Sequence, residues 1–191
     1  NYVAIAGPVA STRTGLGRPI ARSVGGRLLT ETPDLALIEA FCADPLGLAW
    51  PLGLESLNAA SRVLAPEASI WQEAAPWWVS DFWFDRCLAF ARAWLPAERR
   101  GAFDPQFAEA ARTVVRPKLT VVFDIAGDGP LQEIGARRPD PSGLAKEAWR
   151  RMRDALEACL RRPEVGPVLH LANESSDQSL QEVLAAMAAM K

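Results

Sequence analysis

The first residues with recognisable chemistry follow a short apolar run, Tyr2-Val-Ala-Ile-Ala. The next eight residues have the frame of a phosphate-binding loop, G-x-x-x-x-G-K-[ST], with Gly7 and Thr14 in register. In an intact loop, glycines let backbone N–H groups surround the phosphates, the lysine reaches their oxygens and the hydroxyl holds Mg²⁺. Here Thr12 replaces the second glycine and Arg13 replaces the lysine. The segment therefore predicts a degenerate nucleotide-binding loop; the alternative is a strand-to-loop turn without any phosphate-binding history.

The replacements alter the shape of the loop as well as its chemistry. A planar guanidinium on a longer stem does not take the place of a compact ammonium inside a tight loop. A side chain at Thr12 disfavours backbone conformations that glycine adopts freely. Pro19 follows Arg13 by six residues, and a proline inside a helix removes a hydrogen bond. We therefore expect the next helix to begin near Pro19, with Gly15-Leu-Gly17 as loop and the anion site displaced or lost.

Two carboxylates come directly after strand-like runs. Glu31 follows residues 27–30, and Asp81 follows residues 77–80. In a parallel sheet the carboxyl ends of the strands face the crevice where ligands bind, so both are candidate site residues. The alternatives are a solvated Glu31 in the turn beside Pro33 and Asp81 as the N-cap of the helix that follows.

The elements that would position these residues alternate along the chain. Such alternation predicts an α/β fold, a three-layer sandwich with a five-stranded parallel sheet and a central first strand. The expected strands are residues 2–6, 27–30, 77–80, 119–125 and 168–172. The expected helices are residues 33–41, 46–65 with a break near Pro51, 80–95, 104–115, 144–160 and 177–190.

Bulk properties narrow the class of protein. A length of 191 residues predicts one domain over residues 1–191, and a net charge of −2 without a basic cluster argues against nucleic-acid binding. No apolar run approaches the roughly 20 residues of a membrane-spanning helix. Three separated cysteines and one histidine argue against a zinc site or disulfide framework, so we expect a cytoplasmic protein. The first residue is not methionine, which suggests a trimmed, processed or longer chain.

With its elements in this order, the sequence resembles the bacterial deoxynucleoside kinase family. The third of four matching segments is the most specific, with the family pattern V-S-D-[YF]-x-F-[DE]-[KR]-x-x-x-F-A. The four segments are Gly7-Pro8-Val9, residues 28–31 followed by 37–45, residues 79–91, and residues 116–124. The resemblance implies a P-loop kinase fold, a homodimer joined through helices (residues 46–65 and 84–95 are rich in apolar side chains), and a lid at about residues 126–143.

The resemblance also implies roles for individual residues. The family residue matching Glu31 takes the proton from the sugar 5′-hydroxyl, and the one matching Asp81 helps to hold metal or substrate. Thr14 would hold Mg²⁺. The family loop has a glycine at the position of Ala10. A family glutamine reads the base; an ungapped match places Gly53 there, Glu55 is a second candidate, and Phe82 beside Asp81 is a further substrate-binding candidate.

The lid departs from the family pattern. That pattern, R-x-x-x-R-x-R, surrounds the transferring phosphate, but only Arg137 is in register, while Glu133 and Pro139 occupy the other two arginine positions. Two interpretations follow. In the first, catalysis is weak or lost and the domain is retained to bind a nucleoside or nucleotide, or to assemble with a fused or separate protein partner. In the second, an active kinase uses ATP and Mg²⁺ to phosphorylate a deoxynucleoside.

Overall fold

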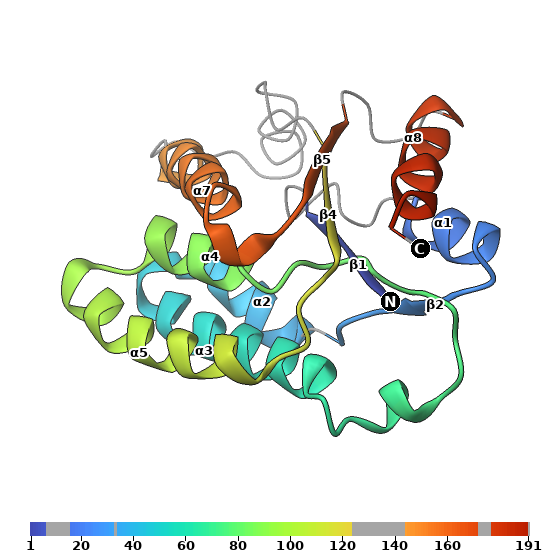
Figure 1. Ribbon diagram of the computed structural model, residues 1–191. Coiled ribbons are helices and arrows are strands. Elements are labelled where there is room, and N and C mark those ends of the chain that lie inside the picture. The colour runs from blue at the N-terminus through green and yellow to red at the C-terminus, as the bar shows by residue number, and fades with distance from the viewer. Residues whose placement is uncertain (7–15, 33, 124–143, 172–176, 191) are drawn as a thin grey trace.

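Figure 1 shows the protein as a computed structural model, which describes residues 1–6, 16–32, 34–123, 144–171 and 177–190. Its centre is a five-stranded parallel sheet in the order β2-β3-β1-β4-β5. The strands are β1 (Tyr2–Ala6), β2 (Arg27–Leu29), β3 (Trp78–Ser80), β4 (Leu119–Phe123) and β5 (Val168–Leu171). The predicted parallel sheet with a central first strand is therefore confirmed.

Helices cover both faces of this sheet (Figure 1). Because successive side chains of a strand point to opposite faces, β1 supplies both layers. Val3 and Ile5 pack in one cluster with Ile20 of α1 (Gly17–Ser23) and Val183 of α8 (Asp177–Ala188). Tyr2, Ala4 and Ala6 belong to the opposite, larger cluster. The helices on that side are α3 (Pro45–Leu64), α4 (Arg86–Trp94), α5 (Ala97–Thr113) and α7 (Leu144–Leu160), and α2 (Leu35–Ala43) packs against α3.

Several helix boundaries differ from the sequence prediction. The helix α3 runs unbroken through Pro51, because its buried face, including Ala49, Leu52 and Leu57, is held by the core despite the lost hydrogen bond. Likewise α5 begins at Ala97 rather than at residue 104 and contains Pro105. In the described segments the structure also has two short 3₁₀ turns, η1 (Ser69–Gln72) and η2 (Pro163–Val165).

The helices next to the expected site also begin at other residues than predicted. The helix α1 begins at Gly17, so Pro19 lies in its first turn, where a missing N–H breaks no helical hydrogen bond. The helix α4 begins at Arg86 rather than residue 80. The turn before it buries three consecutive aromatic residues, Phe82, Trp83 and Phe84, which would point in three directions on a helix.

Candidate functional site

The carboxyl ends of β2 and β3 bring the two predicted carboxylates to the same edge of the sheet. Glu31 lies two residues beyond β2, and Asp81 is the first residue after β3. The Asp81 N–H donates to the Leu29 carbonyl at 3.3 Å, so the two strand ends stay joined beyond the ladder itself. Both residues thus lie at the carboxyl ends of neighbouring parallel strands, while a ligand crevice there and their chemical roles remain predictions.

Glu31 is held by an arginine that comes 55 positions later in the chain. Nη2 of Arg86, the first residue of α4, donates to Glu31 Oε2. The pair is largely closed to solvent, with side-chain exposures of 10% for Glu31 and 21% for Arg86. The other carboxylate oxygen, Glu31 Oε1, is buried and has no hydrogen-bond partner among the described residues. This oxygen is an acceptor that a hydroxyl group of a ligand could satisfy.

Arg86 is the functional residue that sequence reasoning missed. Its guanidinium lies 5.7 Å from the centre of the Phe82 ring, and burial lowers its pKa from the ordinary value. Arg86 stands in the segment most specific to the family, so its type could be read from the sequence. The direction in which the Arg86 side chain points could not be read from the sequence, because it depends on the non-helical turn over residues 81–85.

Asp81 differs from Glu31 in having no counter-charge. No lysine or arginine in the described part of the chain forms an ion pair with Asp81, and burial raises the pKa of its half-buried carboxyl. The alternative N-cap role is wrong, because Asp85 occupies the N-cap position of α4. Asp81 lies near the start of α1, since a Cβ built on Gly17 would come within 3.8 Å of Asp81 Cβ.

Asp85, the residue before Arg86, carries a fully buried carboxylate. Arg162 Nη1 donates to Asp85 Oδ1 at 3.2 Å, and Arg116 Nη2 lies 2.8 Å from Asp85 Oδ2. Burial raises the pKa of Asp85, while the two nearby guanidinium groups partly offset that effect. Asp85 and Arg86 are thus adjacent in the chain and engage different partners.

The other predicted site residues divide into two groups. Gly7, Ala10, Thr12, Arg13, Thr14 and Arg137, like the lid segment 126–143, lie outside the described residues. The substrate candidates have the following contacts: a Cβ on Gly53 would touch Phe90 and Phe103, Glu55 forms an exposed ion pair with Arg62, and Phe82 is in the core with its ring beside Arg86. Their proposed part in base recognition is therefore not visible in their present contacts.

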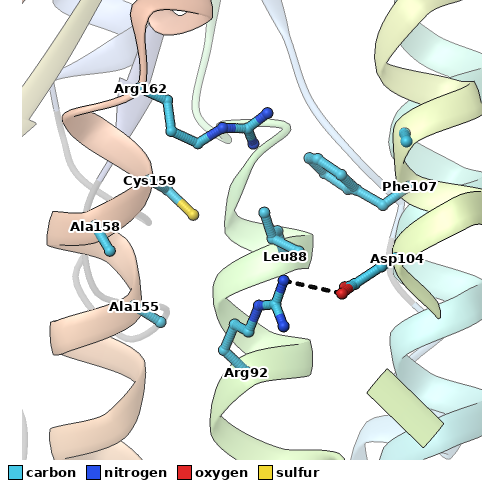
Figure 2. Close-up of a pocket in the computed structure, with 9 residues that line it drawn as sticks. Leu88, Arg92, Asp104, Phe107, Ala155, Ala158, Cys159 and Arg162 are labelled. Atoms are coloured by element: carbon cyan, nitrogen blue, oxygen red, sulfur yellow. Dashed lines mark hydrogen bonds and ion pairs between the residues drawn. The ribbon is translucent and has the colours of Figure 1, made fainter. Parts of the chain in front are cut away.

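A groove of about 530 Å³ opens between α4, α5 and α7, away from these predicted residues (Figure 2). Its lining is mostly apolar, with Leu88, Phe107, Cys159 and three alanines. Arg92 and Asp104 form a 3.0 Å ion pair across one part of it, and Arg162 lies at another.

The residues at the sheet edge can be tested for a fit to Mg²⁺. The carboxylate of Asp81 is the type of oxygen ligand that Mg²⁺ takes, and Thr14 would add a hydroxyl. The described residues contain no group of three His, Cys, Asp or Glu side chains that could hold a metal by themselves. A site with one carboxylate plus nucleotide phosphates, as is usual for Mg²⁺, is compatible with Asp81.

Comparisons with known proteins were made for sequence and for structure. No protein-family model and no curated protein matches the sequence. Among solved structures, deoxyadenosine kinase from M. mycoides with products dCMP and dCDP superposes with a TM-score of 0.77, over 99% of this chain and 100% of that one, at 11% identity. The same kinase with dATP gives 0.73, over 99% and 100%, at 12%. Thymidylate kinase from Ehrlichia chaffeensis gives 0.55 at 14% identity over 97% of both chains.

These likenesses define the class of fold. The chain has the α/β fold of the P-loop nucleoside kinases, with a five-stranded parallel sheet, as the sequence predicted. At such low identity the likeness concerns the fold and leaves activity open. Within the described residues, none of the helices has the length and apolar character needed to cross a bilayer.

Proposed function

We propose that this chain is a deoxynucleoside-kinase-like domain that binds a nucleoside or nucleotide, with phosphoryl transfer weak or lost. The observation that supports it most is the Glu31 carboxylate, with one oxygen fixed by Arg86 and the other buried without a partner among the residues that the structure describes. A buried carboxylate oxygen without a donor is costly, and a sugar hydroxyl supplies the missing donor.

Ligand binding then follows from the placement of these side chains. Glu31 Oε1 accepts the hydrogen bond of a sugar hydroxyl, and Arg86 keeps the carboxylate from rotating away. Asp81 and Thr14 would contact a metal ion, and the segment 7–14 would contact phosphates. ATP with Mg²⁺, when bound, supplies a transferable phosphoryl group. Glu31 would accept the proton of the attacking hydroxyl, as a general base positioned within hydrogen-bond reach.

The loss of rate is proposed from the residues of the loop and lid. Phosphoryl transfer depends on positioning and on charge stabilisation, which the family loop and lid provide. Ala10 and Thr12 take the place of glycines, Arg13 that of the lysine, and Glu133 puts a negative charge where the family has an arginine. Each missing electrostatic element typically costs about 3 to 4 kcal/mol of transition-state stabilisation.

Calorimetric titration of the four deoxynucleosides, with and without ATP and Mg²⁺, tests the binding part. We expect at least one nucleoside to bind, and Glu31→Gln to weaken it at least about tenfold, the worth of a hydrogen bond to a charged group. The matched control is Glu109→Gln, an exposed glutamate on α5, which should bind as the wild type does. If no nucleoside binds, the proposal fails.

A homodimer and a cytoplasmic location are also part of this proposal. The apolar side chains of α3 and α4, which suggested the dimer, fill the core instead, with Leu46, which is 71% exposed, as the main exception. Leu46 and Leu35, at the start of α2, are the exposed large apolar side chains of the described residues, and a helix-mediated dimer would cover them. The free, buried thiols of Cys87 and Cys159 suit a reducing compartment. Light scattering tests the dimer: a species of 20.7 kDa at micromolar concentration would exclude it.

A further inference from the structure

Asp85 occupies a helix N-cap without acting as one. An aspartate at this position normally accepts a hydrogen bond from the second or third backbone N–H of the helix. In α4 the Asp85 side chain makes no such bond. Its carboxylate turns inward, 1% exposed, to the guanidinium groups of Arg116 and Arg162. The residue is therefore used for its contacts with two distant segments rather than for capping.

Those two arginines fix Asp85 from different parts of the fold. Arg116 precedes β4, and Arg162 follows the last turn of α7. Each is itself restrained by an aromatic ring, Arg116 over Phe84 at 5.6 Å and Arg162 over Phe107 at 5.8 Å. Three segments are thus joined at one carboxylate, where the chain enters α4.

The residue next to this junction is Arg86, which holds Glu31. Consecutive Cα atoms are about 3.8 Å apart, so a displacement of the Asp85 backbone also displaces the start of Arg86. The first turn of α4 is bonded to the same point, since the Leu88 and Ala89 N–H groups donate to the Asp85 carbonyl at 3.1 and 3.2 Å. The direction of the Arg86 side chain therefore depends on where Asp85 is held.

Stability alone does not account for this arrangement. The desolvation of a buried ion pair often cancels its attraction, and well-packed apolar residues can replace such a group without loss. Burial raises the pKa of Asp85, and the two arginines act in the opposite direction, so part of their attraction offsets the cost of burying the carboxylate. Fixing the position of the first turn of α4 would be a function for the buried Asp85 carboxylate that does not depend on a gain in stability.

We propose that Asp85, held by Arg116 and Arg162, is a positioning residue that fixes the first turn of α4 so that Arg86 reaches Glu31. The end of α7 is thereby linked to the carboxylate at the crevice edge. Arg162 also lines the groove of Figure 2, so the far end of this link lies at the surface. The value of the link for ligand binding rests on the proposed function, whereas the link itself can be measured without ligand.

A double-variant cycle with Arg162→Met and Glu31→Gln tests the link by urea unfolding. Arg162→Met removes one of the two cations on Asp85, and Arg116 keeps the buried charge paired. In the part of the chain that the structure describes, Arg162 contacts Asp85, Glu164 and Phe107 and makes no ion pair or hydrogen bond with Glu31 or Arg86, so independent sites would give additive effects. We expect Glu31→Gln to cost less in the Arg162→Met background, with a deviation from additivity of at least about threefold in the unfolding equilibrium constant.

The neighbouring Arg161 provides the matched control. It stands on the same helix end but pairs with Glu157 at the surface, so Arg161→Met and Glu31→Gln should be additive. Arg162→Lys, which keeps a positive charge beside Asp85, should give a much smaller deviation from additivity with Glu31→Gln than Arg162→Met gives. Additivity for Arg162→Met, or the same deviation for Arg161→Met, would overturn the proposal.

Nucleoside affinity adds a readout that a merely structural role would not move. Arg162→Met should weaken binding several-fold in the wild type and leave it unchanged in the Glu31→Gln background, because the effect acts through Glu31. An equal loss in both backgrounds would contradict the proposal. If the wild type binds no nucleoside, the proposed function fails, and the unfolding cycle still decides on the link.

Asp85→Asn is a second variant, in which amide exchange of the Leu88 and Ala89 N–H groups should speed up.

Discussion

At the scale of the residue, the two carboxylates at the crevice edge are in different electrostatic states. Glu31 forms an ion pair with Arg86, whereas Asp81 forms no ion pair with a lysine or arginine among the described residues. An ion pair this well buried should respond very differently to truncation than the surface pairs of the helices. This difference gives a direct test of the Glu31–Arg86 contact.

Arg86→Met should lower the free energy of unfolding by about 3 to 5 kcal/mol, because it leaves Glu31 as an unpaired buried charge. Arg112→Met is the matched control, since Arg112 is 74% exposed and pairs with Glu109 on the surface of α5. Its effect should be within about 1 kcal/mol. Urea unfolding at pH 7 measures both variants, and equal losses would show that Arg86 does not hold Glu31.

Stability should also fall at high pH because of the buried thiols. Burial raises the pKa of Cys87 from 9.0 to about 11. Below pH 9 the thiol is neutral in both states; above it the unfolded chain loses the proton first, so the stabilising contribution is lost as pH rises through 11. For Cys87 this amounts to a loss of about 1.5 kcal/mol between pH 9 and 10.5. Cys87→Ala should therefore flatten the pH dependence of urea unfolding, and an unchanged slope would contradict this.

At the scale of the element, strands were predicted more accurately than helices. The runs at β1, β4 and β5 are short and apolar, β1 has the predicted bounds, and β4 and β5 begin at the predicted residues. Helix starts were less predictable, because the core decides them. The break expected at Pro51 and the early start expected for α4 were wrong, since burial of a whole face outweighs one proline or one periodic pattern.

Two glycines in different elements should respond oppositely to alanine. A Cβ on Gly26 would lie 2.4 Å from the Trp77 carbonyl oxygen, where β2 meets β3. Gly26→Ala should therefore cost about 1 to 3 kcal/mol, as overpacking does. Gly101 lies on α5 with nothing within 4 Å of a Cβ, so Gly101→Ala should stabilise by about 0.5 to 1 kcal/mol. Thermal unfolding of both variants measures this, and shifts of the same sign would refute it.

At the scale of the whole molecule, part of the site could be predicted and part could not. Glu31 and Asp81 could be identified because each follows an apolar strand, and the strands of a parallel sheet end at one edge. The residues that pair with the acidic side chains could not be identified from the sequence. Arg86 is 55 positions from Glu31 along the chain, and Arg162 is 77 positions from Asp85. Such distances along the chain are closed by the fold, and no local pattern records them.

The fold and the crevice together make phosphoryl transfer the property to measure. The fold superposes on deoxyadenosine kinase with a TM-score of 0.77, while the loop and lid residues differ at several positions from those of the family that the sequence resembles. We expect nucleoside binding to persist and transfer to be weak or lost, because transfer depends on phosphate positioning more than binding of the sugar does.

The most direct measurement is transfer of radiolabelled γ-phosphate from ATP to each deoxynucleoside with Mg²⁺, in wild type beside Glu31→Gln. We predict that the wild type gives no product above the Glu31→Gln control at nucleoside concentrations that saturate binding. Product well above the control would contradict the proposal and identify the chain as an active deoxynucleoside kinase.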